Sequence, residues 1–193
     1  ASSLSPAAEQ AAFDYLRAEA PAMGLTGGDV AELEVSAGHQ SALSGINYVY
    51  VQQMYRGVPV VDGLVTVAVD GRGNVVHAAG DLVPNIDSPT TSSAVSLSAS
   101  QAVSTVAGLV EAPRTPTTAL GQGMDKVVRF GEVAGFDVSA RQVYVTDGRT
   151  ATLAWEVQVP TADGQHVWVV RIDAATGAAL NRYDLVVHDH WAH

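Results

Sequence analysis

Two blocks of alternating apolar and polar residues, each preceded by a helix-like segment, constrain this fold more than any other feature of the chain. In the first block, valines recur at every second position through 49–51 and 65–69, and an Asp-Gly turn at 70–73 leads into a returning strand. The second block alternates through 152–159 and 166–172. A period of two is that of a half-buried strand, and short polar turns join antiparallel neighbours. The pattern therefore predicts two antiparallel sheets.

Helix-start signals precede both blocks. Ser5 followed by Pro6 suits the N-cap and first position of a helix. Ser98 followed three residues later by Gln101 forms a capping-box pattern, with apolar residues at helical spacing behind it. We therefore expect an α+β fold made of two helix-plus-antiparallel-sheet units.

A stretch rich in Pro, Ser and Thr separates the two units and contains few large apolar residues. We predict a first domain over 1–84, a linker over 85–97, a second domain over 98–187 and a C-terminal tail over 188–193. The unit lengths differ and their sequences do not match, so the chain is not an array of repeats.

Charge and composition exclude several classes of function. The net charge is -10, with only ten Lys and Arg residues among 193. Nucleic acids and anionic membrane surfaces both require clustered basic residues, so neither is an expected partner. The chain has no cysteine, which excludes disulfides and thiolate metal sites. No apolar run reaches the roughly 18 residues of a membrane helix.

The sequence carries no recognisable catalytic constellation. It lacks His-Glu-x-x-His and Gly-x-Ser-x-Gly motifs. Asp70 and Asn74 bracket a polar segment that we interpret as a hairpin turn and not as a calcium loop, because no bidentate Glu follows. Glu156 falls on the polar side of a strand, where we expect it to be either solvated or paired with an arginine such as Arg171. We predict no catalysis, no bound metal and no cofactor in this chain.

Residue types that commonly bind metal ions are densest at the C-terminus, where the sequence reads His188, Asp189, His190 and Trp191. Histidine and aspartate at this density suit metal binding. A frayed terminus is one interpretation of this segment. The other is a tail that docks into the cleft of a partner protein.

One segment resembles a known family. Residues 48–60 closely resemble the core of the fungalysin/thermolysin propeptide motif, the FTP domain, although Tyr48 stands where a polar residue is common. The motif residues here are Gln52, Gln53, Tyr55, Gly57, Val58, Pro59 and Val60. Glycine and proline around Val58 suit a sharp break between strands. The resemblance implies that these residues maintain the fold or contact a partner.

The second block is similar to a PepSY domain. Residues 153–157 and 167–177 look like its final strands, including an Asp-Ala-x-Thr-Gly turn at 173–177. The order FTP then PepSY resembles the prosegments of fungalysin-type (M36) and thermolysin-type (M4) proteases. This resemblance implies two cystatin-like units.

The resemblance also implies a function. Such a prosegment is a secreted, non-catalytic propeptide that helps its zinc protease to fold, inhibits it and is removed on maturation. The partner would then be the cognate catalytic domain, which carries the zinc, and His188, Asp189, His190 and Trp191 would contact its cleft. A signal peptide would already have been removed ahead of Ala1. The alternative is a freestanding secreted binding module or trans-acting inhibitor, and the reading frame beyond His193 would distinguish the two.

Overall fold

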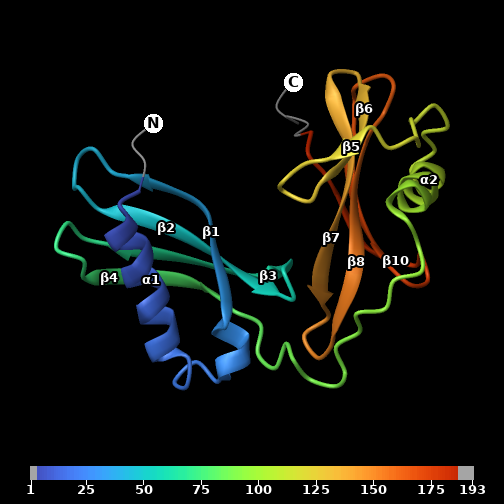
Figure 1. The fold of residues 1–193 in the computed structure, drawn as a ribbon. Helices are drawn as coiled ribbons and strands as arrows, with labels where there is room; N and C mark the ends of the chain where they lie inside the picture. Colours follow the sequence, from blue (N-terminus) through green and yellow to red (C-terminus); the bar gives the residue numbers. More distant parts are fainter. Residues whose placement is uncertain (1–3, 187–193) are drawn as a thin grey trace, which may run out of the picture. The chain divides into compact units, whose positions relative to one another are not determined.

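The computed structural model describes residues 4–186, and its contacts divide the chain into two compact units. One unit contains the residues up to Ser92 together with Tyr144–Ala151. The other contains Ser93–Val143 and the residues from Thr152 onward. Both units mix helix and sheet, as the sequence predicted (Figure 1).

Helix α1 (Pro6–Glu19) opens the first unit, where the sequence predicted a helix. The Ser5 side chain accepts a 3.1 Å hydrogen bond from the backbone N–H of Ala8, and this satisfies one of the unpaired donors of the first turn. Ala12 and Leu16 lie on the buried face of the helix. A short 3₁₀ helix, η1 (Gly27–Val30), follows.

Four antiparallel strands form the first sheet, in the order β1-β2-β3-β4. They are β1 (Glu32–Gln40), β2 (Asn47–Tyr55), β3 (Val58–Val69) and β4 (Val75–Asp81). Helix α1 lies across one face of this sheet (Figure 1). The alternating valines of β2 and β3 point at the helix and form the core with it. The opposite face of the first sheet carries no helix of this unit within the described residues.

The second unit also begins with a helix, α2 (Ala99–Leu109). Its predicted capping box is present, because the Ser98 side chain accepts from the Gln101 N–H at 3.1 Å and the Gln101 side chain accepts from the Ser98 N–H at 2.8 Å. The buried face of α2 carries Ala102, Val103 and Val106.

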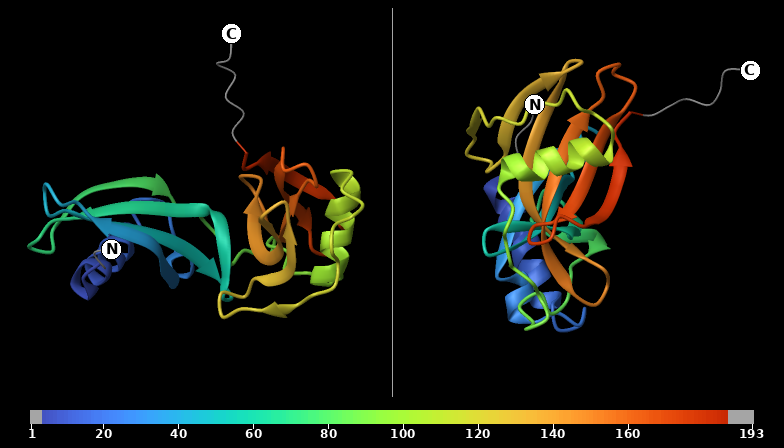
Figure 2. Two further views of the ribbon diagram at one scale, coloured as in Figure 1. Left: turned by 90° about the horizontal axis from the view of Figure 1, so that it is seen from above. Right: turned by 90° about the vertical axis from the view of Figure 1, so that its right-hand side faces the viewer.

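The second sheet has the strand order β7-β8-β9-β10, with β6 beside β7 and β5 beside β6. Its strands are β5 (Gly121–Gln122), β6 (Val128–Val133), β7 (Phe136–Thr146), β8 (Ala151–Pro160), β9 (Val167–Asp173) and β10 (Ala179–Asp184). Helix α2 lies across one face of these strands (Figure 2, right). On that face, the indole N–H of Trp155 donates a 2.9 Å hydrogen bond to the carbonyl of Leu97. This bond connects β8 to the segment that immediately precedes α2.

Candidate functional site

The two glutamines of the motif have different surroundings. Gln53 is fully buried, and its amide nitrogen donates to the carbonyls of Asp29 (3.0 Å) and Val83 (2.9 Å), while its carbonyl oxygen accepts from the Val83 N–H (2.8 Å). Gln52 is half-buried and donates to the carbonyls of Val60 and Gly63. Both side chains therefore satisfy backbone groups where the β2–β3 ladder is irregular, and Gln53 has no surface to offer a partner.

Asp29 extends the same buried network. Its side chain is fully buried, and its carboxylate accepts from the N–H groups of Thr26 (2.9 Å), Asn85 (2.9 Å) and Ile86 (2.9 Å). Ile86 is itself buried. The segment that the sequence suggested as the start of a linker is therefore fastened to the first unit by backbone hydrogen bonds to one carboxylate.

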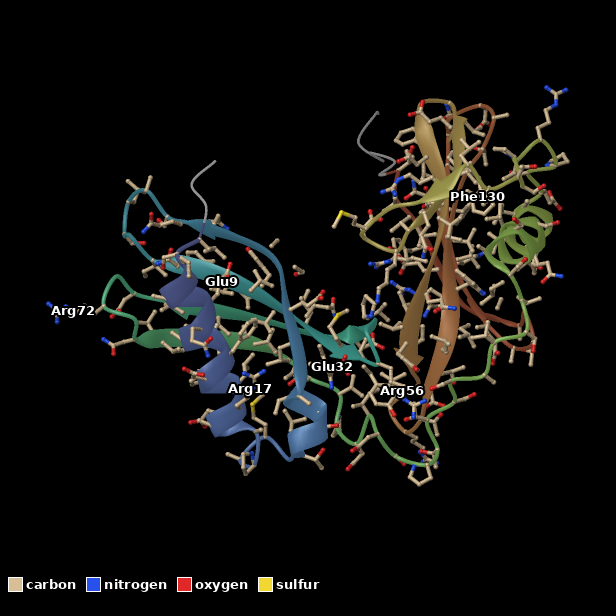
Figure 3. The ribbon with its side chains drawn as sticks, viewed as in Figure 1. Glu9, Arg17, Glu32, Arg56, Arg72 and Phe130 are labelled. Carbon is tan, nitrogen blue, oxygen red and sulfur yellow. The ribbon has the colours of Figure 1, made fainter. Side chains whose placement is uncertain are left out.

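The motif continues into a two-residue hairpin turn between β2 and β3. Arg56 and Gly57 have positive φ angles of 51° and 73°, the signature of the turn that matches strand twist. The Glu32 carboxylate, at the start of β1, accepts from the Arg56 N–H at 2.8 Å and from the Gly57 N–H at 3.0 Å. Figure 3 labels Glu32 and Arg56 at this end of the first sheet. Glycine at 57 adopts this left-handed conformation without the steric cost that a side chain would add.

The remaining motif residues lie around this turn. Val58 and Pro59 are half-buried at the start of β3, whereas Val60 is fully buried and pairs in parallel with Tyr144. The rings of Tyr55 and Tyr144 meet edge to face, with centroids 5.2 Å apart. Surface for a partner therefore remains on Tyr55, Val58 and Pro59.

A second cluster in the first unit was missed from the sequence. On the helix-free face of the first sheet, the His39 ring stacks on Tyr48 with centroids 5.0 Å apart, and Tyr50 lies 6.1 Å from His39. Half-buried aromatic side chains on a sheet face that no helix covers are typical of protein interfaces. The alternation of Tyr48 and Tyr50 with buried valines was the signal that could have indicated this face.

The last described strand is held by an acidic side chain. Asp184 Oδ2 lies 2.7 Å from His166 Nδ1, and Asp184 Oδ1 accepts from the N–H groups of Val167 and Val186 at 3.0 Å. Burial acts to raise the pKa of Asp184, but the hydrogen bonds from His166, Val186 and Val167 outweigh it and lower this pKa to about 2. Asp184 thus ties the end of β10 and Val186 to the start of β9.

The predicted cleft-contact residues His188, Asp189, His190 and Trp191 lie outside the described residues. Among residues 4–186, no group of three or more His, Asp or Glu side chains is arranged to hold a metal ion. Within the same residues, no helix is long and apolar enough to cross a membrane.

Comparisons with known proteins agree with the motif. Residues 31–82 match the Fungalysin/Thermolysin Propeptide Motif. The chain is 30% identical over 181 residues to thermolysin of Alicyclobacillus acidocaldarius subsp. acidocaldarius, and equally to thermolysin of Bacillus caldolyticus. Each match covers 92% of this chain but only 30% of the relative, so the chain spans about a third of the length of these proteins. The matched residues contain β1 to β4, and with them the Gln52–Val60 hairpin.

A solved structure is also similar over most of the chain. The Bacillus megaterium YpeB C-terminal domain aligns over 97% of this chain and 68% of its own, with a TM-score of 0.39 and 12% sequence identity.

Proposed function

We propose that this chain is the propeptide of a secreted zinc metalloprotease, which assists the folding of its catalytic domain, inhibits it and is removed on maturation. The observation that carries the proposal is the match of residues 31–82 to a propeptide motif within a chain that aligns with about a third of thermolysin. A folded surface that binds only the native catalytic domain stabilises that domain by mass action and shields its intermediates.

The finer organisation belongs to the same proposal. The first domain, 1–84, is FTP-like, the second, 98–187, is PepSY-like, and both are cystatin-like units. The protease is of the M36 or M4 type, and the partner catalytic domain supplies the zinc and the chemistry. Support comes from the repeated plan of one helix on one antiparallel sheet, seen with α1 on β1–β4 and with α2 on β7–β10.

The surfaces that remain accessible suit contact with such a partner. In the first unit they are Tyr55, Val58 and Pro59 beside the hairpin, and the Tyr48, Tyr50 and His39 cluster on the helix-free face. The three tyrosines and His39 combine aromatic area with polar tips, which interfaces favour, and Val58 and Pro59 add apolar surface.

Refolding in trans tests the proposal. The catalytic domain of Bacillus caldolyticus thermolysin is refolded from denaturant with and without the separate full chain, and the recovered peptidase activity is measured after the chain has been digested away. We expect at least a tenfold gain in activity and, before digestion, inhibition of the mature enzyme. An unrelated acidic protein of similar size is the control. Equal recovery with the chain and with the control would contradict the proposal.

A further inference from the structure

The open face of the second sheet carries a charged cluster that the proposed function does not use. Trp155 and Ile172 pair across β8 and β9 and point toward α2, so their neighbours Glu156 and Arg171 point to the opposite face. In the described part of the chain, no helix of the second unit lies on that face. We call this helix-free surface the open face.

Two arginines share one carboxylate on the open face. Arg141 Nε donates to Glu156 Oε1 at 2.8 Å, and Arg171 Nε donates to Glu156 Oε2 at 2.8 Å. Two positive charges against one negative charge leave the cluster with one net positive charge. Glu156 is 13% exposed, whereas Arg141 is 40% exposed. The surplus charge is therefore presented to solvent mainly by Arg141.

The two arginines differ in how their remaining donors are used. Arg171 Nη1 donates to Asn181 at 3.2 Å, and its guanidinium lies 5.4 Å from the centroid of the Tyr183 ring. For Arg141, neither terminal nitrogen makes a hydrogen bond to any residue between 4 and 186. As far as the described residues go, both nitrogens are therefore available to an acceptor, and a planar guanidinium matches a carboxylate in geometry.

The cluster lines a hollow of about 270 Å³ that also has apolar walls. Val127, Val169, Tyr183 and Leu185 supply the apolar part, and Ser139 and Gln158 supply further polar groups. A ligand that places a carboxylate on Arg141 would thus bring its neighbouring side chain against apolar surface. This combination fits an acidic residue beside an apolar one in an extended peptide.

We propose that this hollow binds a carboxylate side chain from an acidic-apolar segment of the partner protein, with Arg141 as the principal contact. The identity of the partner as the protease catalytic domain rests on the proposed function. Charge complementarity carries the choice of ligand: a surface with one surplus positive charge, on a chain of net charge -10, attracts a single carboxylate while the whole chain repels polyanions.

A peptide titration tests the site without any protease. The full chain, ¹⁵N-labelled, is titrated with acetyl-Ala-Glu-Leu-Ala-amide, which carries a single carboxylate, and with the same peptide in which Gln replaces Glu. We expect shifts at Arg171, Tyr183 and Leu185 with the acidic peptide only. Arg141→Gln should weaken binding at least fivefold, and Glu156→Gln, which removes the competing carboxylate, should strengthen it at least threefold.

Arg72→Gln is the matched control, because Arg72 projects from the exposed β3–β4 turn of the first unit (Figure 3) and its loss changes the net charge equally. Equal binding of the Gln peptide, or equal effects of Arg141→Gln and Arg72→Gln, would overturn the site. If Arg141→Gln weakens peptide binding but leaves inhibition of thermolysin unchanged, the protease is not the occupant. If the wild-type chain does not inhibit thermolysin at all, the proposed function fails while the peptide titration still decides the site.

Discussion

Asp29 and Ile86 lie 57 residues apart in the sequence, yet the Asp29 carboxylate accepts a 2.9 Å hydrogen bond from the backbone N–H of Ile86. The same carboxylate accepts from the N–H groups of Thr26 and Asn85. One buried side chain therefore joins the start of η1 to the segment that follows β4. Its position beside Gln53, which donates to the Asp29 carbonyl at 3.0 Å, places the propeptide motif within this network.

Replacing Asp29 should be among the most destabilising single changes in the first unit. Asp29→Ala leaves three backbone N–H groups without an acceptor, and we expect the free energy of unfolding to fall by about 3 kcal/mol. The tryptophans at 155, 168 and 191 all follow the first sheet in sequence, so urea unfolding is best followed by amide NMR signals of β2 and β3. Asp14→Ala, on the exposed side of α1, should change the midpoint little.

Gly63 and Gln53 should show strong energetic coupling. A Cβ added at Gly63 would lie 2.7 Å from the Cβ of Gln53 and would also collide with its carbonyl oxygen. Because three hydrogen bonds hold the Gln53 amide, the side chain cannot move aside without losing them. We expect Gly63→Ala to cost about 2–3 kcal/mol.

A double-mutant cycle isolates this effect. Gln53→Ala alone also costs stability, because it leaves the Val83 N–H and two carbonyls unpaired. The double variant should cost at least 1 kcal/mol less than the sum of the two single variants, because Ala at 53 removes the collision with the side-chain oxygen of Gln53, although the contact with its Cβ remains (~1 kcal/mol is the scale for contacting residues). Gly71→Ala, where an added Cβ meets nothing within 4 Å, is the control. Additive effects would show that Gly63 is not required by Gln53.

Local features of the fold could be predicted from the sequence more completely than its long-range ones. The Ser5 cap, the Ser98 and Gln101 capping box and the Glu156–Arg171 pair are all confirmed, because each depends on neighbours in sequence or on strand alternation. The sequence pattern does not predict the β6–β7 hairpin. Its turn at Ala134 and Gly135 interrupts a segment in which Gly131 and the exposed Phe136 obscure the period of two.

The Asp29 network and the Glu156 cluster show the same contrast between local features, which the sequence predicts, and long-range contacts, which it does not. Nothing near Asp29 indicates that its carboxylate is buried, because its partners Asn85 and Ile86 come from the far end of the first unit. Arg141 joins Glu156 only through the placement of β7 beside β8. Such contacts depend on the tertiary arrangement of the strands, and no local pattern in a single sequence reveals them.

The low pKa of Asp184 predicts how the second unit responds to acid. The folded pKa of about 2 lies below the ordinary value of 3.8, so the carboxylate stabilises the folded state fully above the ordinary value. That contribution is lost as the pH falls from about 4 toward 2. Asp184→Asn should therefore be less stable than wild type by about 1–2 kcal/mol at pH 6, and the difference should shrink toward zero near pH 2.

Tryptophan fluorescence can follow this effect, because Trp168 stacks on His166 with centroids 5.2 Å apart, and His166 pairs with Asp184. Urea titrations at a series of pH values give the difference in unfolding free energy between the two proteins. Asp14→Asn serves as the control for the change in net charge. A stability difference that stays constant from pH 6 to pH 2 would show that the Asp184 carboxylate does not make this contribution.

The C-terminal tail gives the last prediction, which rests on the proposed inhibition of a zinc protease. Val186, the last described residue, donates its N–H to the Asp184 carboxylate at 3.0 Å. We predict that His188, Asp189, His190 and Trp191 contact the protease cleft. Imidazole or carboxylate groups can replace the water on a catalytic zinc, and an indole can fill an apolar subsite.

Mutations can distinguish two modes of inhibition, zinc binding by the tail and simple occupancy of the cleft. If the tail binds the zinc, replacing His188, Asp189 and His190 together with Ala should raise the inhibition constant for the mature protease at least tenfold, or about 1.4 kcal/mol. If the tail acts by occupying the cleft, this triple change should have little effect, whereas deleting 187–193 should weaken inhibition because one of two linked attachment points is lost. Inhibition constants for the wild type, the triple variant and the deletion, measured with one peptide substrate, decide between them. Unchanged inhibition by the deletion variant would place the whole interface on the folded units.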